Sequence, residues 1–310
     1  YYQPNNMISV SNLIFRMKKN AVGLATIAIL STMVLVTLSG GANIYAGGDY
    51  MQKAMFPHDF SIQGKGVTGE QMEQALTEFV NEQQLPVTKK VIYPYYTMGV
   101  KSRVGNQLDI FEANQKFVTP KAYILAVSEA DYQSMTGKTL NLGDDEVALY
   151  QQGVKLDSKQ DLQLAGQTFK IKEELKEDFI FGNLPDQMNM IVPEKIYMVL
   201  KNPSQVFSAL MDKYAVNLDY YGGLNTRLST EEQRNLRDAY QEKLHLFNLT
   251  LHENQAVYGS VTAFDKQEIK GMLGGMFFIG IFLSIVFMLG TILIIYYKQI
   301  SEGYEDRDRF

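Results

Sequence analysis

Residues 135–139 (MTGKT) have the composition of a phosphate-binding loop, in which glycine amides and a lysine contact the phosphates. Such a loop needs a second glycine five residues before Gly137, and Tyr132 occupies that position. The segment also lies in the part of the chain that its flanks place outside the cell, away from cytoplasmic ATP. We therefore expect no nucleotide binding there.

Histidine and cysteine side chains give little support for catalysis or metal binding. The chain has three histidines and no cysteine, which excludes thiolate nucleophiles and cysteine metal sites. His245 and His252 are seven residues apart, with Glu253 adjacent, so a metal site is conceivable. Two incidental histidines on a surface helix explain the spacing better, and no nucleophile elbow or zinc-protease motif is present. We predict no catalytic residue, metal or cofactor, and no enzyme activity.

The segment between the two apolar stretches has many tyrosines, and tyrosine suits binding because its side chain is large, fairly rigid and amphipathic. For any single position, a half-buried strand tyrosine is the commoner explanation. We nevertheless single out five as candidate contacts for a peptide or lipid ligand: Tyr93, Tyr95, Tyr96, Tyr220 and Tyr221.

Two long stretches without a charged residue dominate the organisation of the chain. They cover residues 21–46 and 271–297. A bilayer core about 30 Å thick needs roughly 20 apolar residues in a helix, and both stretches exceed that length. A cleaved signal peptide has a shorter apolar region and a small-residue cleavage site. We therefore predict two transmembrane helices, at 20–46 and 271–297.

Basic residues precede the first stretch and follow the second, and they predict how the two helices are oriented in the membrane. Arg16, Lys18 and Lys19 precede the first span, and Lys298 follows the second with two further arginines. By the positive-inside rule both ends are cytoplasmic, so residues 47–270 lie outside the cell. Residues 1–19 include an amphipathic helix suited to the inner leaflet surface, although the first turns of the span would look similar. Residues 298–310 form a charged cytoplasmic segment.

Small residues within the spans predict close packing against other helices. The first span carries a stripe of them, and the second carries a GxxxG pair near its outer end and a second small pair on a different face. Neither span holds an ionisable residue, which argues against an ion path. The candidate packing residues are Ala25, Ala28, Thr32, Ser39, Gly271 and Gly275, and the second pair is Gly280 with Ser284.

The segment 47–270 alternates helix-like and strand-like runs, which predicts an α+β domain. Capping boxes at Thr68 and Ser229 each open a helix. From Gln255 onward, Val257, Val261 and Phe264 recur at helical spacing and predict a stalk helix that continues into the second span. Without cysteine the domain needs a packed core, as is common in Gram-positive surface proteins. The predicted strands are 91–96, 122–127, 147–150, 169–171 and 190–192, the first with Pro94 at an edge or bulge.

Two segments resemble a known family. Residues 6–24 (NMISVSNLIFRMKKNAVGL) are similar to the cytoplasmic helix and the start of the seventh membrane helix in bacitracin-export-type (BceB-like) ABC transporter permeases. Residues 296–310 (YYKQISEGYEDRDRF) resemble the segment after the eighth helix. These permeases belong to the FtsX-like class, with ten membrane helices and a large extracellular domain between the seventh and eighth. The resemblance covers the layout of the chain and the sequence of its two ends.

The resemblance implies a permease fragment that works with partners. It implies a cytoplasmic ABC ATPase subunit, where ATP hydrolysis would occur, and a membrane-bound histidine kinase for sensing. The outer domain would engage an antimicrobial peptide or a lipid II cycle intermediate, within surrounding membrane lipid, and no nucleic acid is expected. Two other functions share the topology: a two-span sensor or chemoreceptor, and an FtsX-like regulator of a cell-wall hydrolase. The sequence names neither the peptide nor the residues that bind it.

Overall fold

The computed structural model describes residues 4–115, 119–184 and 194–307. It divides the chain into two compact units, a helical unit and an outer domain. The helical unit comprises Tyr1–Asp49 and Glu268–Phe310, and the outer domain comprises Tyr50–Gln267. The predicted strand at 190–192 lies outside the described residues.

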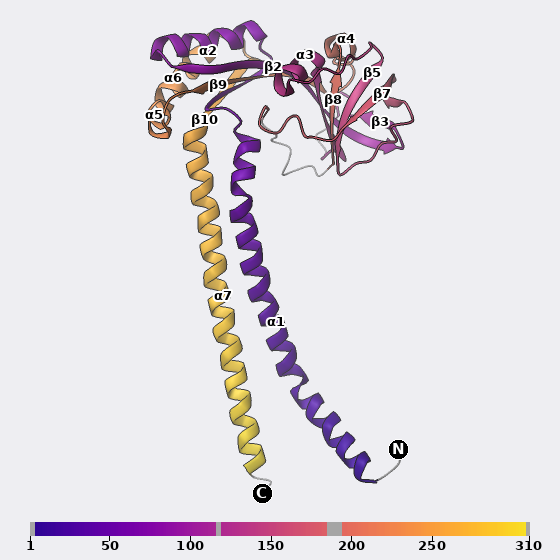
Figure 1. Cartoon of the computed structure of the whole chain (residues 1–310), viewed down its shortest axis with the longest axis vertical. Coiled ribbons are helices and arrows are strands. Elements are labelled where there is room, and N and C mark those ends of the chain that lie inside the picture. Colours follow the sequence, from indigo (N-terminus) through magenta and orange to yellow (C-terminus); the bar gives the residue numbers. More distant parts are fainter. Residues whose placement is uncertain (1–3, 116–118, 185–193, 308–310) are drawn as a thin grey trace. The chain divides into compact units, whose positions relative to one another are not determined.

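Two long helices make up the helical unit (Figure 1). They are α1 (Pro4–Met55) and α7 (Thr262–Arg307). Each contains a segment long and apolar enough to cross a membrane, Ala25–Gly48 in α1 and Thr262–Ser301 in α7. The predicted amphipathic segment 7–19 is continuous with α1.

The two helices run antiparallel and meet along a seam with coiled-coil spacing. The less exposed positions recur every three or four residues from Gly23 to Gly41 in α1 and from Leu273 to Lys298 in α7, the pattern that keeps one face of each helix against the other. Thr37 and Ser284 meet at mid-seam, with 2.7 Å between their hydroxyl oxygens. The seam residues are Gly23, Ile27, Leu30, Val34, Thr37, Gly41 and Gly48 in α1, and Leu273, Phe277, Gly280, Ser284, Phe287, Thr291, Ile294 and Lys298 in α7.

Glycines allow this close approach at several levels of the seam. A β-carbon on Gly41 would lie 3.2 Å from the ring of Phe277, which also stacks on Tyr45 at 5.6 Å between ring centroids. A β-carbon on Gly280 would lie 3.4 Å from the carbonyl oxygen of Thr37. Small residues therefore do bring these helices together, as is usual between apolar helices.

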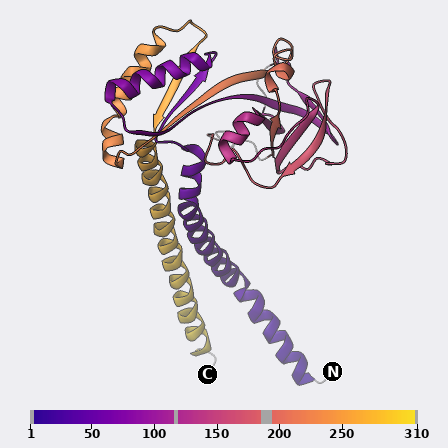
Figure 2. The same ribbon diagram turned by 45° about the horizontal axis from the view of Figure 1, so that its top comes forward.

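The outer domain is rich in β-sheet and consists of two lobes that share one long strand (Figure 2). In the first lobe, four strands lie in the order β10-β1-β9-β2. Helices α2 and α6 pack on one face of them around a core that includes Phe60, Phe79 and Tyr240. The elements are β1 (Phe60–Lys65), α2 (Gly69–Gln83), β2 (Val87–Val104), β9 (Val216–Thr226), α5 (Thr230–Asn235), α6 (Arg237–Asn248) and β10 (Ala256–Val261).

In the second lobe, the sheet closes on itself. The order runs β2-β3-β6-β7-β5-β8-β4, and β4 pairs with β2 again, which gives a small barrel with a filled interior. Closure leaves the barrel strands without an open edge at the ring. The elements are β3 (Gln107–Ile110), β4 (Ala122–Ser128), α3 (Glu129–Thr136), β5 (Glu146–Gln152), β6 (Leu162–Leu164), β7 (Gln167–Leu175), β8 (Glu194–Leu200) and α4 (Pro203–Phe207).

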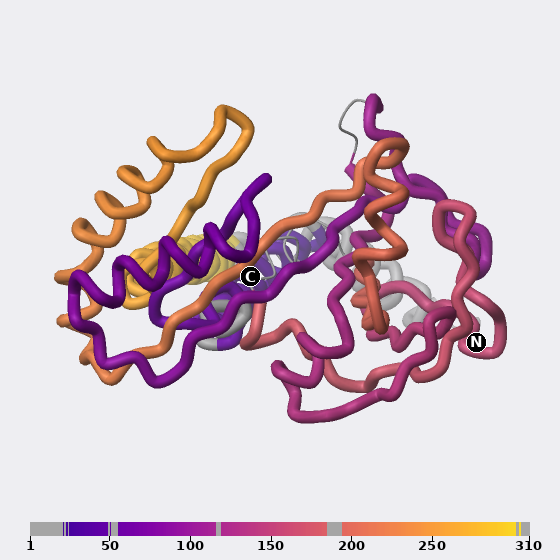
Figure 3. The backbone as a smooth tube through the Cα atoms, turned by 90° about the horizontal axis from the view of Figure 1, so that it is seen from above, coloured from indigo at the N-terminus to yellow at the C-terminus, as the bar shows by residue number. Residues whose placement is uncertain are grey.

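The long strand β2 connects the lobes, and β9 accompanies it from one into the other (Figure 3). Its N-terminal part pairs with β9, and its C-terminal part pairs with β4 and β3. At Pro94, β2 pairs with β9 on one side and with no described strand on the other. The proline therefore lies at an edge of the sheet, as the sequence predicted.

Most local predictions for the outer domain are confirmed. Both capping boxes form, at Thr68 before α2 and at Ser229 before α5. The runs predicted at 91–96, 122–127, 147–150 and 169–171 fall within β2, β4, β5 and β7. The chain therefore consists of two long apolar helices flanking a sheet-rich domain that contains both helices and strands.

The predicted stalk helix from Gln255 is wrong in its first part. Residues 256–261 form β10, which pairs with β1, and α7 begins only at Thr262. Val257 and Val261 are four residues apart, and this spacing returns to the same face in a strand as well as in a helix. Gly259 faces the same side, where its missing β-carbon lets α6 approach the strand closely. Asn248 of α6 further bonds both backbone groups of Val257 and covers the edge of β10.

Substitution of Gly259 by alanine should destabilise the outer domain. The added β-carbon would lie 2.4 Å from Leu244 Cδ1 and 2.8 Å from the carbonyl oxygen of Ser61, so strand or helix must shift. Overpacking of this kind costs about 1–3 kcal/mol. Denaturant unfolding of the purified protein, followed by tyrosine fluorescence, measures the change. Gly275→Ala, where a β-carbon meets open space, is the matched control, and equal stability of both variants would contradict the prediction.

Candidate functional site

A cleft of about 470 Å³ opens beside the barrel, between the end of α3 and the end of β7. This volume falls in the range of ligand-binding pockets. Its lining comes from two short stretches of chain and combines aromatic, acidic and basic side chains. The lining residues are Tyr132, Thr136, Lys138, Glu173, Glu174, Leu175, Lys176, Glu177, Asp178, Phe179 and Asn183.

The floor of the cleft is apolar. Tyr132 and Phe179 meet edge to face, with 5.2 Å between ring centroids, and Phe179 also packs edge to face on Tyr197 of the core. Tyr132 and Phe179 are each 4% exposed, and Leu175 is buried beside them. The Asp178 carboxylate accepts hydrogen bonds from the amides of Ile180 and Phe181, which holds the turn that carries Phe179.

The rim of the cleft is charged and predominantly acidic. Four carboxylates face two lysines across the lining. Lys138 forms an ion pair of 2.8 Å with Glu177, and hydrogen bonding and attraction from Glu177, with Glu173 nearby, raise the pKa of the lysine. Among the described residues, neither Glu173 nor Glu174 has an ion-pair partner. The rim therefore presents excess negative charge to solvent.

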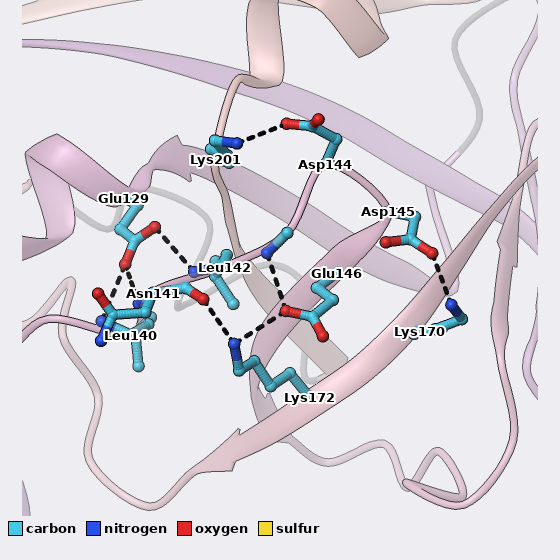
Figure 4. Close-up of polar contacts among 11 residues, drawn as sticks. Glu129, Leu140, Asn141, Leu142, Asp144, Asp145, Glu146, Lys170, Lys172 and Lys201 are labelled. Carbon is cyan, nitrogen blue, oxygen red and sulfur yellow. Dashed lines mark hydrogen bonds and ion pairs between the residues drawn. The ribbon is translucent and has the colours of Figure 1, made fainter.

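A polar network fixes the loop that follows α3 and carries Lys138 (Figure 4). The Glu129 carboxylate accepts hydrogen bonds from the amides of Leu140 and Leu142 at 2.9 and 3.0 Å, and also from the amide of Asn141. Lys172 of β7 donates to the carbonyl of Asn141 and lies 2.9 Å from a carboxylate oxygen of Glu146. The two walls of the cleft, α3 with its loop and β7, are thus tied together.

The MTGKT segment forms the C-terminal end of α3. Gly137 adopts a left-handed conformation with φ of 73° and caps the helix, and its amide donates to the carbonyl of Gln133. A phosphate loop instead precedes a helix and uses the helix N-terminus. The local structure agrees with the interpretation that this segment is not a nucleotide site.

The five candidate tyrosines lie on β2 and β9, where Tyr93 pairs with Tyr221 in the strand register. Tyr93, Tyr96 and Tyr221 are buried in two different hydrophobic cores. Tyr95 and Tyr220 are partly exposed, on opposite faces of the sheet. The structure thus does not bring the five together on one surface, and a role in ligand contact stays a prediction.

The predicted packing residues of the helical unit lie away from the seam. Ala25, Ala28, Thr32 and Ser39 are exposed on α1, and a β-carbon on Gly271 or Gly275 would meet open space. The second small pair, Gly280 with Ser284, is the one that contacts α1. Packing of the other small residues against further helices stays a prediction.

Of the cleft residues, the sequence drew attention only to Thr136 and Lys138, which lie in the MTGKT segment, and not as part of a peptide site. The available signal was the charge-dense run at 172–178 (KEELKED), which directly follows the predicted strand at 169–171. The run alone reads as a solvated segment, because charge pattern does not show which apolar side chains lie beneath it.

The histidines form no metal site among the described residues, where no group of three metal-ligating side chains gathers. His245 and His252 are exposed. His58 is buried at the start of the outer domain, with its Nδ1 2.9 Å from the Tyr221 hydroxyl. Burial, together with the positive charge of Lys89, lowers the pKa of His58 to about 4. The imidazole is therefore neutral at neutral pH.

Comparisons with known proteins leave the family of the chain open. No protein-family description matches the sequence, and no curated protein matches it. A crystal structure of a protein named as a lipoprotein from Bacillus anthracis aligns with 65% of this chain and 96% of its own length, at 6% identity and a TM-score of 0.30. A likeness this low carries no conclusion about fold or function.

The buried His58 predicts a loss of stability in acid. In the unfolded chain the imidazole titrates near pH 6.5, and in the fold near pH 4, so the unfolded state binds the extra proton between these values. Stability should therefore fall as the pH drops from about 7 to about 4, by about 3 kcal/mol from this group.

Urea unfolding at several pH values checks this prediction. His58→Asn, which keeps a polar group near the Tyr221 hydroxyl, should remove that part of the pH dependence. His245→Asn removes an exposed histidine and should leave the pH dependence unchanged. An equal acid response in wild type and His58→Asn would show that the contribution comes from other groups.

Proposed function

We propose that this chain is the span–domain–span portion of an FtsX-like ABC permease of the bacitracin-export type. In this proposal residues within α1 and α7 cross the membrane, and the sheet-rich domain lies outside the cell. A cytoplasmic ATPase subunit supplies ATP hydrolysis, and a histidine kinase partner reads the state of the permease. The outer domain engages an antimicrobial peptide or its lipid complex.

The antiparallel seam is the observation that supports this proposal most. It brings the start of the first apolar segment and the end of the second to the same end of the helical unit. There the Lys298 side chain lies against Gly23, which follows Lys18 and Lys19 in the sequence. Basic residues at one common end are what the positive-inside rule requires of two spans whose termini share the cytoplasm. Exposed apolar side chains on both helices, including Leu35, Phe282 and Leu293, suit contact with lipid or further helices.

The cleft supports a role of the outer domain in ligand binding. It is large enough for a peptide side-chain cluster, and it combines an apolar floor with charged groups at the rim. The ion pair between Lys138 and Glu177 lies at the exposed rim, so a ligand cation can replace the lysine without unfolding the domain.

Cysteine labelling tests the proposed orientation without background, because the chain has no cysteine of its own. Ser158→Cys lies exposed in the outer domain, and Ser301→Cys lies exposed beyond the second span. A membrane-impermeant maleimide should label the first variant in intact cells and the second only after permeabilisation. Labelling of Ser301→Cys in intact cells, with Ser158→Cys protected, would reverse the topology and overturn the proposal.

Purification of the tagged protein from its native membrane tests the permease assignment separately. A nucleotide-hydrolysing subunit should co-purify in mild detergent, and deletion of the gene should increase susceptibility to peptide antibiotics. Purification without an ATPase would contradict the proposal. Co-purification with an ATPase but unchanged peptide susceptibility would favour a cell-wall hydrolase regulator.

A further inference from the structure

We propose that the cleft between α3 and β7 is a binding site for an amphipathic cation, in which an ammonium or guanidinium group adjoins an aliphatic or aromatic side chain of a peptide. The assignment rests on the proposed role of the outer domain in ligand engagement. The proposed function allows either a peptide or a lipid pyrophosphate as the ligand, and the cleft as assigned here binds the peptide.

The charge of the rim selects cations. Glu173, Glu174 and Glu177 line the cleft together with Lys138 and Lys176, and the Asp178 carboxylate is already held by two backbone amides. A pyrophosphate would meet these carboxylates and gain at most two lysines, one of them already paired with Glu177. The negative charges of the pyrophosphate and of the rim carboxylates repel each other. An incoming ammonium instead gains Glu173 and Glu174, which have no ion-pair partner among the described residues.

The floor of the cleft selects an apolar neighbour to that cation. Tyr132, Leu175 and Phe179 form it, and an apolar side chain beside the bound cation would contact the small part of these residues that is exposed in the cleft. Floor and rim thus recognise two different parts of one ligand.

Lys138 acts as an internal substitute for the ligand cation. Its ammonium lies 2.8 Å from Glu177, and the side chains are 60% and 81% exposed, so the pair opens readily. When a peptide ammonium approaches Glu177, Lys138 swings into solvent and leaves the carboxylate to the ligand. Glu129 and Lys172 keep the cleft walls in place during this exchange, because their contacts do not involve the Lys138 side chain.

Calorimetric titration of the full chain in zwitterionic lipid nanodiscs tests the assignment. The probe is the tetrapeptide acetyl-Lys-Phe-Leu-Lys-amide, compared with acetyl-Glu-Phe-Leu-Glu-amide and with inorganic pyrophosphate, and empty nanodiscs correct for lipid partitioning. The basic peptide should bind and should weaken as salt rises from 50 to 300 mM. Glu177→Gln should weaken binding about threefold, and Lys138→Gln should strengthen it about threefold, the scale of an exposed ion pair.

Matched variants separate the cleft from general surface charge. Glu242→Gln and Lys155→Gln change the net charge by the same amounts on exposed positions elsewhere in the domain, and they should leave the affinity unchanged. Equal effects of cleft and control variants, or tighter binding of pyrophosphate than of the basic peptide, would overturn the assignment. So would absence of peptide binding. The test needs neither an ATPase nor a defined orientation, so its failure removes the cleft assignment and leaves the permease proposal standing.

Discussion

The antiparallel pairing of β1 with β10 is the constraint on which the arrangement of the outer domain depends. It sets the first and last strands side by side, with Phe60 opposite Val261. The amide of Thr262 then donates to the carbonyl of Asp59 at 2.9 Å, and the Asp59 carboxylate accepts from the amide of Thr226 in β9. The chain therefore leaves α1 and returns to α7 through one hydrogen-bonded part of the domain.

Side chains from α5 and α6 strengthen this junction at the first turn of α7. Arg234 donates to the carbonyl of Ala263, and the Arg237 guanidinium lies 4.1 Å from the centroid of the Phe264 ring. His58 is buried at the same place, and this burial lowers the pKa of its imidazole. The first turn of α7 is consequently part of the outer-domain fold, which explains why this long helix begins at a defined residue, Thr262.

The sequence was sufficient where a pattern has one physical explanation. Capping boxes at Thr68 and Ser229 and the short β-branched runs were sufficient to locate elements, because their side chains act on neighbouring backbone. The strand at 256–261 was missed because valines four residues apart suit either structure. The barrel closure and the cleft could not be predicted, since both depend on pairings such as β4 with β2 and β5 with β8 between distant segments.

The two faces of α1 show why small residues alone do not identify a packing surface. Gly41 contacts α7 directly, whereas Ala25, Ala28, Thr32 and Ser39 are just as small and remain exposed. What distinguishes the seam is the partner at the same level, since Phe277 fills the space that Gly41 leaves and Ser284 meets Thr37. Lipid cannot follow a narrow stripe of small side chains as closely as a helix can, so packing against another helix gains van der Waals contact that lipid cannot supply. Under the proposed function, the exposed stripe on α1 is a face that a further membrane helix could contact in this way.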